Sequence, residues 1–160
     1  MIITLRDGTK ENWQACVGLR LAPEQEHFVA SNAYSLAESK FMPTFVPQAI
    51  YYRATPDAAE ILVGFAMYGY YPDGVPPLGL RHWIFRLMIA HEQQGHGYGT
   101  AAMREVIARL EADPACDEVL IGYEPDNVVA RALYGRLGFV EQGTTPWGEL
   151  YARLATTTPA

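Results

Sequence analysis

Apolar and polar residues alternate along this chain with two different periods, and these periods predict strands and helices. Runs rich in Ile, Val, Tyr and Phe with a repeat near two residues are typical of β-strands. Such runs occupy residues 1–6, 48–54, 61–71, 82–90, 117–124, 139–143 and 147–154. Segments with apolar residues every three or four positions predict α-helices. These segments cover residues 11–21, 23–41, 100–110 and 126–138.

The order of these segments is β-α-α-β-β-β-α-β-α-β-β, which predicts an α/β (α+β) fold. We expect one mixed, twisted sheet of six to seven strands with about four helices. A short turn separates the strands at 48–54 and 61–71, so these strands should form an antiparallel hairpin. The strands at 82–90 and 117–124 are joined through a helix. They should therefore be parallel neighbours.

Length and composition favour one globular domain over residues 1–155, with a disordered tail over residues 156–160. The chain has 160 residues, of which 49% are hydrophobic, and this is enough for a single large core. Its formal net charge of −6 disfavours a protein that neutralises nucleic-acid phosphates, and it suits a small cationic or neutral substrate. A net negative charge is just as often present because it keeps a protein soluble.

Nothing in the sequence predicts a membrane, a secretory or a metal-binding protein. Charged residues within the first ten positions do not fit a secretory signal, and no apolar run reaches the length of a membrane span. The two cysteines, Cys16 and Cys116, have no metal-ligand spacing. We expect reduced thiols and a cytoplasmic location.

Three glycines, Gly95, Gly97 and Gly99, lie between the strand at 82–90 and the helix that follows it. Glycine is usually kept where the backbone turns sharply or approaches a ligand closely. The first amides of a helix lack intrahelical partners and lie at the positive end of its dipole, so such a loop can bind a phosphate. The alternative is a tight turn that only requires a positive φ.

Two nucleotide-binding motifs fit this loop poorly. A P-loop requires Lys followed by Ser or Thr after its last glycine, whereas Gly99 is followed by Thr100 and Ala101. The dinucleotide fingerprint G-x-G-x-x-G is not matched, and the loop lies in the middle of the chain rather than after its first strand. The sequence therefore disfavours both a P-loop nucleotide triphosphatase and a dinucleotide-binding protein.

The loop resembles the acyl-CoA pyrophosphate motif Q/R-x-x-G-x-G/A of the GCN5-related N-acetyltransferase (GNAT) superfamily, with Gln94, Gly97 and Gly99 at its fixed positions. A second run, residues 127–139, matches the family pattern N-x-x-A-x-x-L-Y-x-x-x-G-F. The predicted element order also matches, so the resemblance covers essentially the whole chain. It implies a GNAT fold, acetyl-CoA as acetyl donor and an N-acetyltransferase activity.

The resemblance also implies which residues bind acetyl-CoA. The strand backbone at Leu87, Met88 and Ile89 should bind the pantetheine arm. Asn127 should hydrogen-bond the cofactor, and it could also cap the helix that follows it. The loop backbone should bind the pyrophosphate through Gln94, Gly95, His96, Gly97, Tyr98, Gly99 and Thr100.

Tyr134 stands at the position of the family's general acid and also among the expected cofactor contacts. A phenol, with a pKa near 10, can protonate a departing thiolate when the geometry is right. A tyrosine on an amphipathic helix is otherwise most often a core residue.

A narrower resemblance concerns the acceptor. The segment 21–41, with "HWIFRLMI" and "QGHGYG", resembles the diamine or spermine/spermidine acetyltransferase branch. Ala90, His96 and Thr100 depart from the Asp and Lys that are common there. The superfamily also acetylates antibiotics, amino acids and protein N-termini, and a non-catalytic acyl-CoA-binding domain is the other alternative. A small-molecule amine partner is expected, and a homodimer is compatible with the sequence.

The general base is expected among several candidates, of which Glu24 is preferred. A carboxylate could accept the ammonium proton and also attract a polyamine. The other candidates are Glu26, Glu124, Glu149, His82 and His91. Aromatic faces suit methylene chains and cations. The expected substrate pocket therefore comprises Glu24, Tyr34, Trp83, Glu124 and Glu149, with Tyr123 as a further wall.

Overall fold

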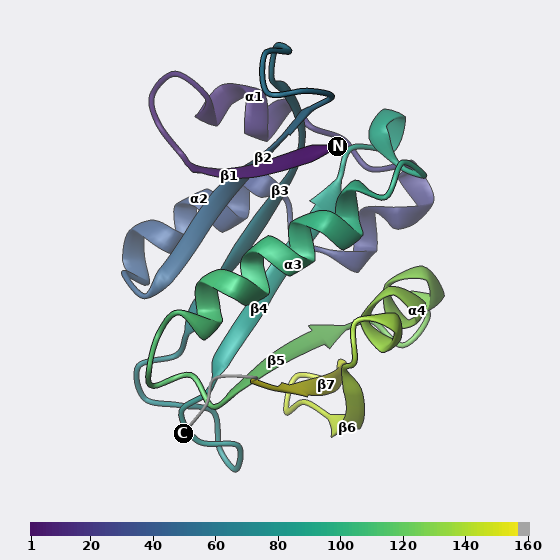
Figure 1. Cartoon of the computed structure of the whole chain (residues 1–160). Helices are drawn as coiled ribbons and strands as arrows, with labels where there is room; N and C mark the ends of the chain where they lie inside the picture. Colours follow the sequence, from purple (N-terminus) through teal and green to yellow (C-terminus); the bar gives the residue numbers. More distant parts are fainter. Residues whose placement is uncertain (157–160) are drawn as a thin grey trace.

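The computed structural model describes residues 1–156 as a seven-stranded sheet with helices packed on it (Figure 1). Residues 157–160, which hold most of the expected disordered tail, lie outside the described residues. No helix within residues 1–156 has the length and apolar character needed to cross a membrane.

The sheet has the order β1-β2-β3-β4-β5-β7-β6. The β2/β3 hairpin is antiparallel and β4 and β5 are parallel neighbours, as the sequence predicts. The remaining neighbours are antiparallel, so the predicted mixed sheet is confirmed. The strands are β1 (Ile2–Asp7), β2 (Phe45–Arg53), β3 (Ile61–Tyr70), β4 (His82–Ile89), β5 (Glu118–Tyr123), β6 (Val140–Thr144) and β7 (Leu150–Ala155).

Four α-helices and two short 3-10 helices occur in the described part of the chain. They are α1 (Trp13–Gly18), η1 (Pro23–Phe28), α2 (Asn32–Phe41), η2 (His91–Gln93), α3 (Tyr98–Glu111) and α4 (Val128–Arg136). The single helix expected over 23–41 is wrong, because Val29 is extended and Ser31 caps α2. The Ser31 hydroxyl accepts a hydrogen bond from the Tyr34 N–H at 3.1 Å, which is the usual role of serine at a helix start.

The two faces of the sheet are covered by different helices. On one face, α3 buries Met103 and Val106 against the sheet residues Val63 and Ile84. On the other face, Cys16 of α1 belongs to a cluster with Phe65 and Met67 of β3 and Met88 of β4. Burial of these side chains stabilises the first half of the sheet and fixes the position of β4.

The parallel pair β4/β5 is short. Only His82–Ile84 pairs with Val119–Ile121, although β4 continues to Ile89 and β5 to Tyr123. Figure 1 shows the two strands starting side by side and then separating toward α4. As a result, the edge of Phe85–Ile89 that faces β5 has no strand partner in the described structure.

A polar bridge holds α3 on the first two strands. The Arg109 guanidinium donates to Gln48 Oε1 and to the Leu5 carbonyl, both at 2.7 Å. The Gln48 side chain is fully buried, and its amide donates to Asp7 Oδ1 at 2.6 Å. Without Arg109, the buried Gln48 oxygen would lose its donor, and an unsatisfied buried acceptor is destabilising.

We therefore expect Arg109→Met to lower the free energy of unfolding by about 1–3 kcal/mol, measured by urea titration. Arg104→Met is the matched control, because Arg104 lies exposed on the same helix. The control should stay within about 0.5 kcal/mol of the parent chain. Equal stability of the two variants would contradict the proposed stabilising role of the bridge.

Candidate active site

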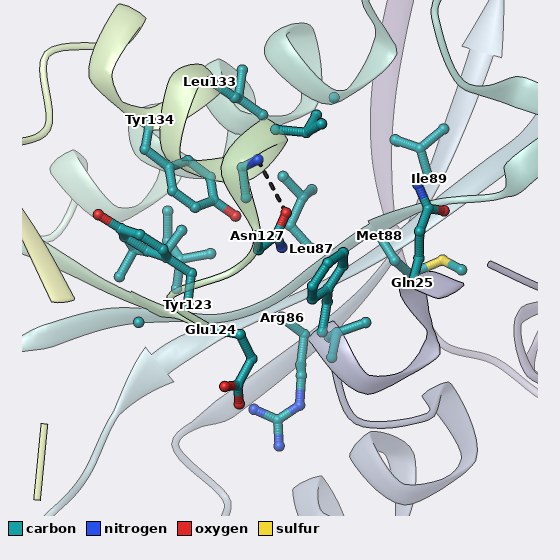
Figure 2. Close-up of a pocket in the computed structure, with 18 of the residues that line it drawn as sticks. Gln25, Arg86, Leu87, Met88, Ile89, Tyr123, Glu124, Asn127, Leu133 and Tyr134 are labelled. Carbon is teal, nitrogen blue, oxygen red and sulfur yellow. Dashed lines mark hydrogen bonds between the residues drawn. The ribbon is translucent and has the colours of Figure 1, made fainter. Parts of the chain in front are cut away.

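A cavity of about 720 Å³ opens where β4 and β5 separate. Its walls come from β4, the end of β5, the glycine loop, α4, η1 and the loop before β7. Figure 2 shows β4 side chains on one side and the α4 side chains of Leu133 and Tyr134 on the other. The early end of the β4/β5 pair is therefore what creates this space.

The glycine loop forms one end of the cavity. Gly95 and Gly97 have φ values of 81° and 83°, in the left-handed region that favours glycine. A Cβ at either position would meet no atom within 4 Å, so the backbone conformation rather than crowding requires glycine there. Gly97 is the N-cap of α3, and the amides of the first helical turn point outward with no intrahelical acceptor.

Gly99 differs from the other two glycines. Its φ lies outside the left-handed region, and an added Cβ would make ordinary contacts of 3.7 Å with Ile89 and 3.8 Å with Leu133. Neither backbone conformation nor crowding therefore requires glycine at position 99, whereas the turn at position 97 does.

The Gln94 side chain connects the glycine loop to η1. Gln94 Nε2 donates to Gln25 Oε1 at 2.9 Å, and Gln25 Nε2 donates back to Gln94 Oε1 at 3.2 Å. Gln94 Nε2 also donates to the Ile89 carbonyl at 3.0 Å, on the strand edge that β5 leaves open. The sequence motif predicts a role only for the backbone of Gln94, and no motif includes Gln25.

A second contact connects η1 to the far side of the cavity. His27 Nε2 lies 2.8 Å from Asp126 Oδ2, and Asp126 immediately precedes Asn127. The six-residue η1 is thus bonded to the glycine loop through Gln25 and to the start of α4 through His27. No sequence pattern marks these contacts, because their partners are 69 and 99 positions apart.

Asn127 lines the cavity and caps α4. Its Oδ1 accepts the Ala130 N–H at 3.2 Å, the bond drawn in Figure 2. Among residues 1–156, no hydrogen bond uses the Asn127 side-chain nitrogen. The capping role considered from the sequence is therefore present, and the carboxamide N–H groups stay available to a ligand.

Tyr134 is both a core residue and part of the cavity wall. Its side chain is 7% exposed, and its ring lies 5.5 Å from Tyr123 and 6.0 Å from Phe139, between centroids. Figure 2 shows its hydroxyl directed toward the space bordered by Asn127 and Leu87. Burial, with smaller contributions from Tyr123 and Glu149, raises the pKa of Tyr134 well above its ordinary value. The phenol is therefore protonated throughout the neutral range.

Tyr123 is the other phenol in the wall, and its hydroxyl donates to Glu141 Oε1 at 2.7 Å. Burial, followed by the bond to Glu141, raises the pKa of Tyr123 as well. Because that hydroxyl is already engaged, Tyr134 is the better placed of the two to donate a proton to a ligand.

The end of the cavity away from the glycine loop carries carboxylates and aromatic rings. Glu124 and Glu149 line it, as does Trp83, which is 2% exposed. Trp147 lies there too, and its indole N–H donates to Glu149 Oε2 at 3.0 Å. Trp147 is not among the site residues predicted from the sequence. Its position two residues before Glu149, a predicted site residue, could have indicated it.

Three expected site residues do not reach the cavity. Glu24 is exposed on η1, and Tyr34 is 59% exposed on α2. His96 is exposed in the glycine loop and stacks on Tyr98 at 5.4 Å. From η1, Gln25, His27 and Phe28 line the cavity, whereas Glu24 and Glu26 do not.

Three further candidates for the general base, His82, His91 and Glu26, also lie outside the cavity. His82 is buried at the opposite end of β4, with its Nε2 2.9 Å from Asp113 Oδ2. His91 is exposed in η2 and Glu26 is exposed in η1. None of the three lines the cavity.

The other expected cofactor contacts converge on the cavity. They are Leu87, Met88, Ile89, Gln94, Gly95, Gly97, Tyr98, Gly99 and Thr100. Arg86, which belongs to no motif in the sequence, also lines the cavity and donates to Glu38 Oε1 at 3.2 Å.

Residues 12–139 match the family model described as "Acetyltransferase (GNAT) family". The chain is 28% identical to the spermine/spermidine N(1)-acetyltransferase of Bacillus subtilis (strain 168) over 144 residues. That alignment spans 89% of this chain and 91% of the relative.

Solved structures share the whole fold. A structure of the aminoglycoside acetyltransferase AAC(6')-Ib with coenzyme A has a TM-score of 0.74 at 19% identity, covering 96% of this chain and 95% of that one. The spermidine N-acetyltransferase of Vibrio cholerae, in complex with CoA and spermine, has a TM-score of 0.69 at 14% identity. The coverage is again 96% of this chain and 95% of that one. At these identities the likeness concerns the fold.

The two kinds of glycine in the loop should respond differently to alanine. Gly97→Ala forces a Cβ into a left-handed conformation and should lower the free energy of unfolding by about 1–2 kcal/mol. Gly99→Ala is the matched control, and it should leave stability unchanged or slightly raised because alanine favours helices. Urea titration measures both, and equal effects would show that the Gly97 conformation does not constrain the loop.

Proposed function

The chain belongs to the GNAT acetyltransferase family and is an N-acetyltransferase, and from this premise we propose that it acetylates a primary amine of a polyamine such as spermidine, spermine or a diamine. The observation that carries the proposal is one cavity with two chemically different ends. Backbone amides of the glycine loop line one end, and the carboxylates of Glu124 and Glu149 line the other.

The residues present fit acetyl-CoA as the acetyl donor. The open edge of β4 at Leu87–Ile89 offers backbone groups to the pantetheine arm, and the first turn of α3 offers N–H groups to the pyrophosphate. The Gln25–Gln94 pair would hold the loop in position for this contact. Asn127 would contribute its free carboxamide N–H groups.

Tyr134 is proposed as the general acid. Acetyl-CoA supplies an activated thioester carbonyl, and the thiolate that departs needs a proton. A phenol is protonated at neutral pH, burial raises the pKa of Tyr134 further, and its hydroxyl lies in the cavity wall. The apolar surroundings that raise the pKa of the phenol also destabilise a thiolate, which increases the affinity of the sulfur for a proton.

We propose Glu124, in place of Glu24, as the general base, and Glu149, whose Oε2 already accepts the Trp147 indole N–H, as a carboxylate that attracts the acceptor. An amine must lose its ammonium proton before it can attack, and a carboxylate in the cavity can accept that proton directly or through water. Both carboxylates also attract a cationic acceptor. Glu24, which is exposed outside the cavity, is not assigned this role.

The polyamine acceptor is supported by the name of the Bacillus subtilis relative, which aligns over most of both chains, and by the net charge of −6. We further propose that residues 1–155 act as one domain. The cytoplasmic location and the homodimer stay predictions.

To test the acceptor class, the protein is mixed with acetyl-CoA and single amines while the release of free thiol is followed. Spermidine, spermine and diamines should give the highest kcat/KM, above aminoglycosides, amino acids and a peptide N-terminus. Turnover confined to one of the latter classes would contradict the polyamine assignment. Tight coenzyme A binding without turnover on any amine would contradict the catalytic role of this chain.

To test the general acid, Tyr134→Phe removes only the hydroxyl. We expect kcat to fall by about 10²-fold, with little change in the KM for acetyl-CoA, because proton donation by a positioned group contributes about this much. Tyr70→Phe is the control outside the cavity. An unchanged kcat in Tyr134→Phe would rule out the assignment.

The pH profile gives a second measure of the same residue. Because the folded-state pKa of Tyr134 is raised, its acid form persists as pH rises. The parent kcat/KM should therefore increase with pH as the acceptor amine loses its proton, and it should show no descending limb below about pH 10.

A further inference from the structure

Three aromatic rings from separate segments meet at the acidic end of the cavity. Tyr71 follows β3, Trp83 lies on β4, and Trp147 lies in the loop before β7. Their centroids are 6.3 Å apart for Tyr71–Trp83, 6.3 Å for Tyr71–Trp147 and 5.8 Å for Trp83–Trp147. The ring planes are inclined to one another by 77°, 57° and 49°, so the rings form walls rather than a stack.

We propose that these three rings and the Glu149 carboxylate bind a second ammonium group of the acceptor, the one that is not acetylated. This inference rests on the proposed function and names the residues that select a di- or polyamine over a monoamine. The four residues are called the ammonium cage below. All four line the cavity.

Glu149 supplies the negative charge of the ammonium cage. Its Oε2 accepts the Trp147 indole N–H at 3.0 Å, which fixes the ring and the carboxylate relative to each other and leaves Oε1 for an ammonium. Aromatic faces attract organic cations within about 6 Å of the ring centroid, and more strongly where water is excluded. Trp83 is almost fully buried, so one wall of the cage is largely desolvated.

The position of Glu149 also depends on Gly122. A Cβ at this position of β5 would collide with Glu149 Oε2. The carboxylate therefore lies directly against the β5 backbone, in a space that only glycine leaves open. A residue with a side chain at position 122 would displace it.

Glu149 lies within electrostatic range of both Tyr71 and Tyr134. Burial is the main cause of the raised pKa of each phenol, and the Glu149 charge adds to both. Tyr134 lines the same cavity as the ammonium cage without belonging to it. This arrangement suits an acceptor whose two nitrogens are joined by a methylene chain.

The charges around the ammonium cage leave it negative. His27, Arg86 and Arg136 also line the cavity. The Arg86 guanidinium donates to Glu38 at 3.2 Å, His27 lies 2.8 Å from Asp126, and Arg136 lies in the last turn of α4. Within residues 1–156, neither Glu124 nor Glu149 forms an ion pair with a cationic side chain. A buried or half-buried carboxylate favours a counter-charge, and the acceptor ammonium is the one that this site would receive.

The test compares spermidine and 1,3-diaminopropane with propylamine, which lacks the second nitrogen. The parent chain should favour the two polyamines in kcat/KM. Glu149→Gln and Trp147→Leu should each raise the KM for the polyamines by about tenfold, because each removes a cation contact of moderate strength. The kcat for polyamines and both constants for propylamine should change little.

Matched controls separate this effect from general changes in charge or hydrophobicity. Glu105→Gln removes an exposed carboxylate on α3, and Trp13→Leu removes an indole on α1 that is 46% exposed, against 48% for Trp147. Neither control should alter the preference for polyamines. Gly122→Ala keeps every residue of the ammonium cage but displaces the Glu149 carboxylate, so it should reproduce the loss seen with Glu149→Gln.

The outcomes distinguish this inference from the proposed function. If Glu149→Gln and Trp147→Leu lower kcat equally for spermidine and propylamine, these residues act on the reacting nitrogen and the ammonium cage is disproved. Unchanged constants for both acceptors would also disprove it. If the parent chain acetylates propylamine or another monoamine but no polyamine, the proposed function itself fails. Circular dichroism checks the fold of each variant, and Glu149→Gln with Gly122→Ala decides the question should Trp147→Leu unfold.

Discussion

The rest of this structure depends on one parallel strand pair that ends early. β4 and β5 are bonded over only three residue pairs, although both strands continue beyond them. A β-sheet with a split in its middle exposes unpaired backbone groups and apolar side chains, and both are costly unless a ligand or another segment covers them. The glycine loop, α4 and η1 all contact the space that this split creates.

The split is held by contacts on both sides. On the β4 side, α3 packs on one face of the sheet and α1 on the other, and the Arg109–Gln48 bridge fixes α3 to the first strands. On the β5 side, β7 pairs with β5 along its whole length and continues the sheet. The short η1 then bonds to both sides, through Gln25 and through His27. A stable sheet thus carries an opening at its centre.

Burial also determines the chemistry of the opening. Tyr134 packs among core side chains, and this same burial raises the pKa of its hydroxyl beside the cavity. Tyr134 can therefore be a core residue and also act as the proposed general acid. At the other end, Gly122 lets the Glu149 carboxylate lie against β5, where Trp147 fixes it. The proposed general acid and the residues proposed to select the acceptor thus lie in different parts of one cavity.

The sequence by itself determined the element order, the β2/β3 hairpin, the parallel β4/β5 neighbours and the loop and helix that carry Gln94, Gly97 and Tyr134. These features follow from local periodicity and from contiguous motifs, which a single chain displays directly. The sequence did not reveal the break before α2, because apolar spacing continues across Ser31 while the hydroxyl caps a new helix.

Only the tertiary structure decided which side chains reach the cavity. Gln25, whose side chain is hydrogen-bonded to Gln94 of the glycine loop, reaches it, and the neighbouring Glu24 does not. Tyr34 faces outward on α2, whereas Tyr71, Trp83 and Trp147 meet from three separate segments. Such contacts join residues far apart in the chain. They depend on how the strands separate and how the loops close over them, which local periodicity does not encode.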